Sequence, residues 1–183
     1  TIQNSRMNTE TLCKQLNDRF GKDRADKLLA YLRSDSADFF TAPASTRYHG
    51  AHEGGLVEHS LNVYDCLKDM MDRPRMKEVY GIEYPEESIA IAGLLHDICK
   101  ASRLYYGADG CIHHRSTSIK GHGYRSVALL AREGLELTGE EWLAIRWHMG
   151  TSKAAPDVAR KVHHSKLCRL VYASDKLDAK RGH

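Results

Sequence analysis

The chain has 183 residues, enough for one domain with a sizeable hydrophobic core. Its formal net charge of +3 is small, so charge gives no reason to expect a long nucleic acid as partner. No apolar run approaches membrane-spanning length, and the first residues lack the apolar stretch of a secretory signal. Five scattered cysteines without a Cys-x-x-Cys pair indicate free thiols. We therefore expect a cytoplasmic protein without a membrane segment.

Helical periodicity dominates the first half of the chain. Residues 9–20 and 22–33 each carry apolar side chains at three- and four-residue steps, and Gly21 separates the two segments. The stretch 41–55 is rich in Gly, Ser, Thr and Pro and is expected to be largely loop. A long helix is predicted from about residue 56 to residue 71. Another is predicted after Pro85, because proline suits a first helical turn and the two glutamates that follow suit the positive end of the helix dipole.

The second half contains the one predicted departure from helix. In residues 103–114, two short aromatic and apolar segments flank the sequence GADG, which predicts a β-hairpin. Helices are predicted over about 124–133 and 139–149, with Thr138 as N-cap of the latter, and from Pro156 onward with a break near His163. The prediction is a single all-α domain, 1–183, with one small hairpin. Residues 1–47 form an N-terminal helical extension and residues 48–180 the core.

Several histidines and aspartates occupy positions that the helical pattern directs inward. His59 lies on the apolar stripe of the predicted helix 56–71, and His96 and Asp97 end an apolar run. A single inward histidine is more often a hydrogen-bonded core residue than a metal ligand. Several together need several partners, whereas one metal centre satisfies all of them. Imidazoles with carboxylates suit first-row divalent ions. The set is His59, His96, Asp97, His122, His148 and Asp175.

The motifs GGLVEHS, LLHDICK and SDKLDA, in this order, resemble those of the HD superfamily of metal-dependent phosphohydrolases. The resemblance covers about residues 48–180 and identifies this range as the metal-binding core. Within it, the stretch HEGGLVEHS is similar to the corresponding stretch of HD-type 3′–5′ exoribonucleases. It implies a helical HD domain. It also implies a basic ligand set, which on this chain falls on His59, His96, Asp97 and Asp175.

Two further histidines bear on the number of metal ions. Relatives with two metals carry two additional histidines between the His-Asp doublet and the last aspartate, and His122 and His148 lie in that interval. The glycines on either side of His122 allow close backbone approach. The resemblance therefore implies two divalent ions (Fe, Mn, Zn, Ni or Mg), with Asp97 bridging them. The alternative is a single ion, with His122 and His148 contacting substrate phosphate.

The expected activity is hydrolysis of a phosphate ester by a metal-bound hydroxide. The expected substrate is a small molecule, above all a nucleotide or a short nucleic acid, and long RNA is disfavoured by the near-neutral charge. The expected catalytic residues are His96, Asp97 and Lys100. Two other functions stay open from sequence: a diiron oxygenase that uses the same ligands, and a non-catalytic nucleotide sensor. The oligomeric state is open as well.

Substrate groups require positive charge near the metal ligands. Lys100 follows Asp97 by three residues and is predicted to meet a phosphate oxygen. Arg125 and Arg146 lie within one turn of His122 and His148. His49 matches a histidine often found near the first motif in similar HD proteins, and a supporting or substrate-binding role is expected for it. The alternative for Lys100, Arg125 and Arg146 is that each is a solvated surface charge without a role in substrate binding.

Overall fold

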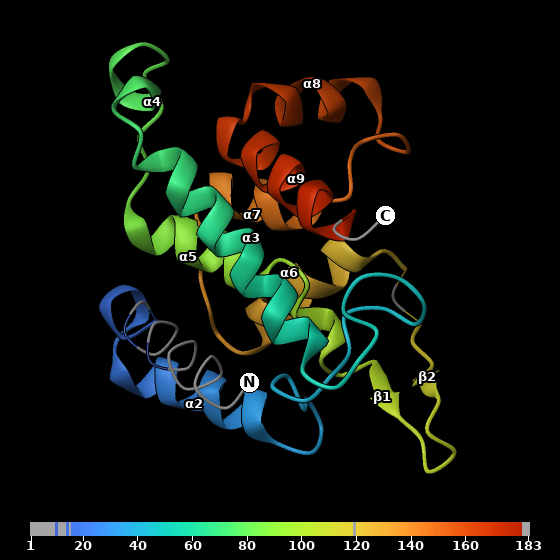
Figure 1. The fold of residues 1–183 in the computed structure, drawn as a ribbon. Helices are drawn as coiled ribbons and strands as arrows, with labels where there is room; N and C mark the ends of the chain where they lie inside the picture. The colour runs from blue at the N-terminus through green and yellow to red at the C-terminus, as the bar shows by residue number, and fades with distance from the viewer. Residues whose placement is uncertain (1–9, 11–13, 15, 119, 181–183) are drawn as a thin grey trace.

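The computed structural model describes residues 10, 14, 16–118 and 120–180, and these form a helical bundle with one small hairpin (Figure 1), as predicted. The predicted helix over residues 9–20 lies partly outside the described residues, although residues 16–20 are helical. The elements are α2 (Lys22–Arg33), α3 (Gly55–Met71), α4 (Pro74–Glu78), α5 (Glu86–Leu95), the 3-10 turn η1 (Ile98–Lys100), β1 (Leu104–Tyr106), β2 (Ile112–His114), α6 (His122–Arg132), α7 (Gly139–Trp147), α8 (Pro156–His164) and α9 (Lys166–Ala179).

Helix α3 crosses the middle of the view in Figure 1. It packs against α5 and α9, while α7 packs against α6 and α9 (Figure 1). The approach of α5 is close at Gly93, where an added Cβ would lie 2.9 Å from the Tyr64 Cα atom of α3. The leucines of the inward stripe of α3 are fully buried. His59 lies on the same face of this helix, and packing therefore directs its imidazole into the bundle.

The His-Asp doublet lies just beyond a helix end. Helix α5 stops at Leu95, and the chain passes through His96 and Asp97 into η1. Helix α6 begins at His122, two residues earlier than predicted. Its first turn lies against the end of α7, because a side chain on Gly123 would collide with the carbonyl oxygen of Arg146. These contacts bring the ends of α5, α6 and α7 to one region of the bundle.

The remaining boundaries follow local chemistry. Thr138 forms a full capping box with Glu141 at the start of α7. The predicted break in the last helical segment falls at Ser165, whose hydroxyl caps α9 by accepting a hydrogen bond from Cys168 N. The short helix α4 was not predicted, because the sequence DRPR reads as the end of α3, whereas its proline starts a new helical turn.

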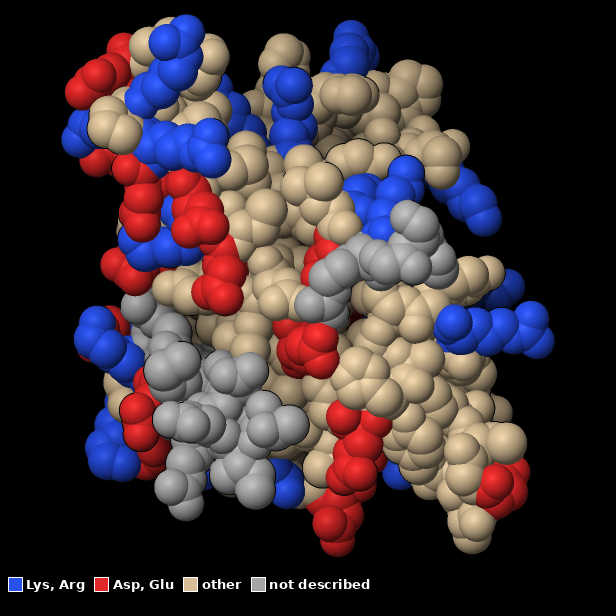
Figure 2. Space-filling view, in the orientation of Figure 1, with Lys and Arg blue, Asp and Glu red and all other residues tan. Residues whose placement is uncertain are grey.

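The hairpin and the surface complete the fold. Strands β1 and β2 are antiparallel and pair Leu104 with His114 and Tyr106 with Ile112, which agrees with the predicted hairpin. Among the described residues, no helix has the length and apolarity needed to cross a bilayer. On the face shown in Figure 2, the described Lys and Arg side chains are interspersed with acidic ones around α4 rather than arranged in one continuous track.

Candidate metal centre

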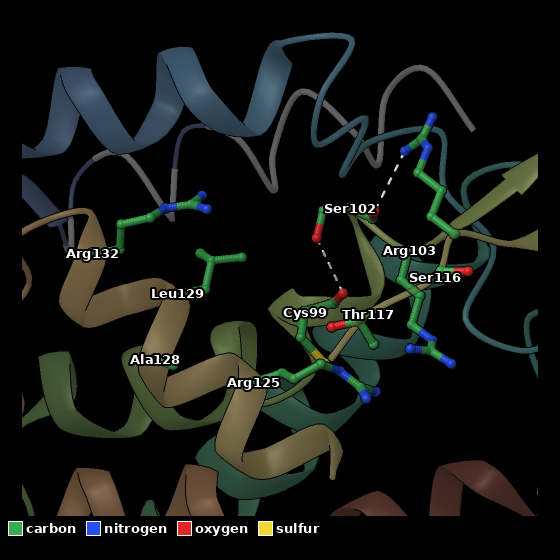
Figure 3. Close-up of a pocket in the computed structure, with 10 residues that line it drawn as sticks. Cys99, Ser102, Arg103, Ser116, Thr117, Arg125, Ala128, Leu129 and Arg132 are labelled. Carbon is green, nitrogen blue, oxygen red and sulfur yellow. Dashed lines mark hydrogen bonds between the residues drawn. The ribbon is translucent and has the colours of Figure 1, made fainter. Parts of the chain in front are cut away.

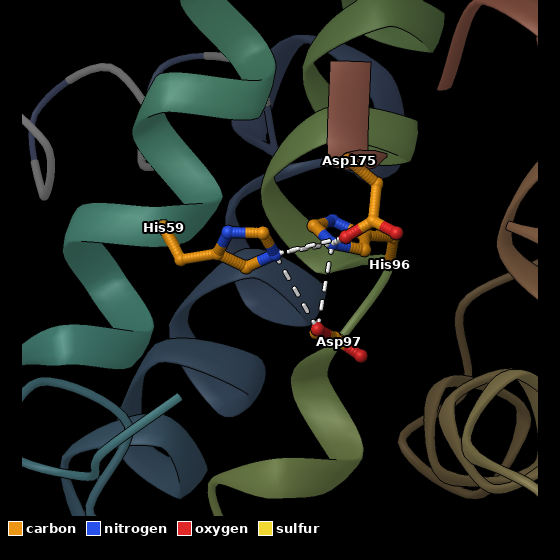
Figure 4. Close-up of side chains that lie close together, drawn as sticks. All are labelled: His59, His96, Asp97 and Asp175. Atoms are coloured by element: carbon orange, nitrogen blue, oxygen red, sulfur yellow. Dashed lines mark hydrogen bonds and ion pairs between the residues drawn. The ribbon is translucent and has the colours of Figure 1, made fainter. Parts of the chain in front are cut away.

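Four buried side chains converge where α3, α9 and the end of α5 meet (Figure 4). His59 Nε2 lies 3.1 Å from His96 Nε2 and 3.2 Å from Asp175 Oδ1. Asp97 Oδ2 lies 3.5 Å from the Nε2 atom of each histidine. His96 Nε2 lies 3.7 Å from Asp175 Oδ1. The structure therefore brings together, from distant parts of the sequence, the four residues that the family resemblance implies as one ligand set.

Hydrogen bonds fix which ring nitrogen of each histidine faces the centre. His96 Nδ1 lies 2.8 Å from the carbonyl oxygen of Gly93. A carbonyl oxygen can only accept, so Nδ1 carries the proton and the neutral ring presents the lone pair of Nε2 to the centre. His59 Nδ1 lies 2.7 Å from Asp178 Oδ2, to which it donates in the same way. Both Nε2 atoms are therefore oriented as ligands.

The two carboxylates at the centre are ionised. Burial raises the pKa of Asp97, but the Lys100 ammonium and the neighbouring histidines outweigh burial and hold this pKa well below its usual range. Burial likewise opposes ionisation of Asp175, and its contacts with His59 and His96 lower its pKa strongly. The centre thus contains two negative charges at almost no exposure to water. Such a set is stable only with a cation.

The donor set fits a divalent metal ion. Ligand atoms about 2.0–2.2 Å from one ion, at tetrahedral or octahedral angles, lie roughly 3.0–3.5 Å from each other. Five of the six spacings between the four inward atoms are 3.1 to 3.7 Å, close to this range, and all four atoms lie within 4.8 Å of one another. Two imidazoles and two carboxylates, without a thiolate, are typical ligands of first-row divalent ions. The residues present therefore fit the metal that the sequence predicts, whereas its identity and number are separate questions.

Without an ion, a proton supplies the missing positive charge. Burial lowers the pKa of His59, but hydrogen bonds to Asp175, Asp178 and Asp97 outweigh it and raise the pKa to about 10. The cluster therefore attracts a positive charge, either a proton or a metal ion. A metal ion has to displace this proton, and its binding releases the proton to solvent.

Asp97 uses its second carboxylate oxygen toward a third histidine. His148 Nε2 lies 3.2 Å from Asp97 Oδ1. The Nδ1 atom of His148 lies 2.7 Å from the carbonyl oxygen of Ile145 and donates to it, so its Nε2 also presents a lone pair. Two acceptor atoms thus face each other, and neither has a hydrogen-bond partner among the described residues. A second positive charge would fit between them.

The contacts of His122 differ from those of His148. Its Nδ1 atom lies 2.9 Å from Arg125 Nη2, which donates to it, and 3.9 Å from Cys99 Sγ. Burial is the main reason that the pKa of His122 falls to about 4, so the ring is neutral. His122 therefore lies beside the centre, and its Nδ1 lone pair is directed to Arg125.

The predicted substrate residues differ in their contacts. Lys100 is buried, and its Nζ atom lies 2.7 Å from Asp97 Oδ2. The His49 ring centroid lies 4.7 Å from that of His59, and neither of its ring nitrogens has a hydrogen-bond partner among the described residues. The guanidinium of Arg146 lies over the ring of Trp147, 4.0 Å from its centroid. Lys100 and His49 thus adjoin the centre, whereas Arg146 is engaged with aromatic rings.

Sequence reasoning gave no role to Asp178, although this residue orients a ligand. Asp178 accepts hydrogen bonds from His59 and from Asn62, which lies 3.0 Å from its Oδ1 atom. Carboxylates that receive the second N–H of a ligating histidine fix its tautomer and raise its basicity. The available signal was the spacing: Asp178 follows Asp175 by three residues on the inward face of α9.

Comparison with known proteins agrees with this geometry. The family model named HD domain matches residues 56–180, and the chain belongs to this family. A dihydroneopterin 2′,3′-cyclic phosphate phosphodiesterase from Methanocaldococcus jannaschii is 40% identical over 89 residues, which are 49% of this chain and 35% of that protein. The chain thus aligns with about a third of the relative's length. No solved structure matches the chain significantly. The family resemblance predicted from the motifs is confirmed, while the boundaries 1–47 and 48–180 stay predictions.

Proposed function

We propose that the chain is a metal-dependent phosphohydrolase that cleaves a small phosphate ester, in particular a cyclic phosphodiester of a nucleotide-like molecule. The observation that carries the proposal is the buried set of two imidazoles, whose Nε2 atoms face inward, and two ionised carboxylates. The name of the M. jannaschii relative supports the class of substrate, because that protein is a cyclic phosphate phosphodiesterase. The reaction breaks one P–O bond with water and leaves a phosphomonoester.

His59, His96, Asp97 and Asp175 would hold the first ion. When bound, a divalent ion supplies Lewis-acid activation of water and neutralises charge on the phosphoryl group. We further propose a second ion, held by His148 and by the Oδ1 atom of Asp97, which faces away from the first set. His122 is the remaining proposed ligand of this second site. Because its Nδ1 accepts a hydrogen bond from Arg125, His122 would be the weaker of the two histidines.

The residues of the chain would orient the ester. The ammonium of Lys100 lies beside the ligand atom of Asp97, where it can donate to a phosphate oxygen that approaches the centre. His49 adds two ring nitrogens beside His59. Arg125 contacts the imidazole of His122. These groups bind and position phosphate oxygens while the buried carboxylates stay ionised, and we propose Lys100 as the main substrate-binding residue.

Phosphorus NMR of candidate substrates would test this function. Protein loaded with Mn²⁺, Fe²⁺, Zn²⁺, Ni²⁺ or Mg²⁺ is incubated with nucleoside 2′,3′-cyclic phosphates and with nucleoside monophosphates. We expect turnover of at least one cyclic phosphate, its loss on treatment with a chelator, and its return on addition of metal. Turnover of none of these esters under any metal would contradict the proposal.

An anaerobic arm separates hydrolysis from oxygenase chemistry. Hydrolysis consumes water alone, so the rate is expected to be the same with and without dioxygen. Product formation that requires dioxygen and a reduced metal would assign the centre to the oxygenase class instead. Binding of nucleotide without turnover would assign it to a sensor.

A further inference from the structure

A cavity of about 250 Å³ lies next to the metal centre, between α6 and the base of the hairpin (Figure 3). Among the described residues, its lining contains four arginines and three hydroxyl side chains but no carboxylate. These polar residues are Arg103, Arg115, Arg125, Arg132, Ser102, Ser116 and Thr117. Guanidinium and hydroxyl groups donate hydrogen bonds, and such a set without carboxylates favours a negatively charged ligand.

The inner wall of the cavity adjoins residues of the metal centre. Cys99 lies two positions after Asp97, and its thiol donates to the carbonyl oxygen of His122 at 3.3 Å. Arg125 lines the cavity and also donates to the imidazole of His122. Cys99 and Arg125 thus line the cavity and also contact His122, a proposed ligand of the centre.

The four arginines differ in how firmly they are held. Arg115 stacks over Tyr105, 4.8 Å from the ring centroid, and Arg132 forms an ion pair with Glu133 at 3.0 Å. Arg103 forms no ion pair with any described residue. In Figure 3, the side chains of Arg103 and Arg125 start on different walls of the cavity, run in different directions and end on the same side of the view. Both place a guanidinium donor on the lining of the same cavity, Arg103 from the segment before β1 and Arg125 from α6.

We propose that this cavity binds a second phosphate of the substrate, distinct from the phosphate that is cleaved. The inference rests on the proposed hydrolase function and specifies its substrate class: a small molecule with two phosphate groups, such as a nucleoside cyclic phosphate that also carries a 5′-phosphate. The size of the cavity supports a single anionic group, because sites for whole drug-sized ligands usually have about 300–1,000 Å³. Arginine forks match phosphate oxygens in a bidentate manner, which gives selectivity as well as affinity.

The test compares two substrates that differ only in the second phosphate. Adenosine 2′,3′-cyclic phosphate and its 5′-phosphorylated form are assayed with the metal-loaded protein. We expect kcat/KM to be roughly tenfold to a hundredfold higher for the 5′-phosphorylated form, the range for charge-assisted hydrogen bonds. Arg103→Ala is expected to reduce this ratio to about one, and Arg103→Gln, which keeps more of the side chain, to behave alike. The matched control is Arg160→Ala, which removes one exposed positive charge on α8 and should keep the ratio.

Binding of inorganic phosphate separates this proposal from the proposed function. Calorimetry on the metal-loaded wild type is expected to show two phosphate sites, and on Arg103→Ala only one. If no ester is hydrolysed but Arg103→Ala still removes one phosphate site, the hydrolase proposal fails and the anion site stands. If cyclic phosphates are hydrolysed but the 5′-phosphate has no effect on kcat/KM and one phosphate site is found, the anion site is overturned while the hydrolase proposal stands.

Discussion

The metal centre and the arginine-lined cavity adjoin each other but are built in opposite ways. In the centre, short side chains are fixed by partners behind them: Gly93 and Ile145 carbonyls and the Asp178 carboxylate hold the three imidazoles. In the cavity, long arginines reach in from a loop, a hairpin and a helix. The first arrangement is preorganised for one charge at one position. The second adapts to an anion and loses more side-chain freedom on binding. Chemistry is therefore expected from the centre and selectivity from the cavity.

Removal of Asp97 would have the largest effect, because this residue faces both proposed ions. In Asp97→Ala, we expect loss of bound metal and a fall in kcat/KM of at least about a thousandfold, since the other ligands lose their shared negative charge. Asp97→Asn keeps the shape and is expected to behave in the same way. Metal analysis and steady-state assays measure both effects. A variant that retains metal and full activity would remove Asp97 from the ligand set.

The second ion is tested by stoichiometry. Wild-type protein saturated with metal is expected to hold two ions per chain, and the His122→Ala/His148→Ala double variant one. Among single variants, His148→Ala should weaken the second ion more than His122→Ala, because only His148 Nε2 faces Asp97 directly. A wild type with one ion per chain would instead place both histidines among the substrate contacts. Equal loss in the two single variants would contradict the ranking.

Asp178 provides a test of preorganisation in the centre. Asp178→Ala removes the acceptor behind His59 Nδ1, so the ring loses its fixed tautomer. We expect metal affinity to fall about tenfold to a hundredfold, with kcat recovered at saturating metal. Asn62→Ala removes a donor to the other oxygen of Asp178 and should cause a smaller loss. Metal titrations with a chromophoric chelator would measure both, and unchanged affinity in Asp178→Ala would show that the packing of α3 alone orients His59.

The contrast between the metal centre and the arginine-lined cavity also explains how much could be predicted from the sequence. Inward positions on helices follow the 3.6-residue period, so the amino-acid pattern alone places His59 and Asp175 on buried faces. The His-Asp doublet and the surrounding motifs then identify the family. The helix starts were predicted less accurately: α6 begins at His122 because Gly121, at φ +87°, turns the chain there, which periodicity does not reveal.

The cavity could not be predicted by the same reasoning. Arg103 and Arg115 flank the hairpin, where no helical period indicates which way a side chain points. They come close to Arg125 because η1, which precedes the hairpin, packs against α6. An exposed arginine in a sequence is usually a solvated charge, and only the tertiary arrangement distinguishes these from the others. The tests of the centre can therefore be designed from sequence, while those of the cavity require the three-dimensional fold.

Lys100 lies at the boundary between the two regions. Its ammonium contacts Asp97 but is predicted to bind substrate phosphate rather than to hold metal. Lys100→Ala is expected to lower kcat/KM about tenfold or more while the metal content stays at the wild-type value. Lys100→Arg, which keeps the charge, should recover part of the activity. Loss of metal in Lys100→Ala would instead assign Lys100 to the support of the centre.

The smallest expected effect concerns Asp38, whose charge acts on Arg115 at the cavity. Burial raises the pKa of Asp38 to about 6, although Arg115 partly offsets this, and the Oδ1 atom of Asp38 has no hydrogen-bond partner among the described residues. Since the folded pKa exceeds the ordinary value of 3.8, the folded state binds more protons between pH 4 and 6, and stability falls as pH rises through that window.

Asp38→Asn removes this dependence. The positive φ of 45° at this position is tolerated by asparagine as well as by aspartate. Above pH 6 the variant is expected to be more stable than the wild type by about 1 kcal/mol, after allowance for solvent screening, and below pH 4 the two should be equal. Urea unfolding at pH 4 and pH 7.5 measures the difference. Because the substitution also removes a negative charge near Arg115, the preference for a 5′-phosphate should rise about twofold at most. A stability gain that persists unchanged at pH 4 would mean that the carboxylate charge is not its cause.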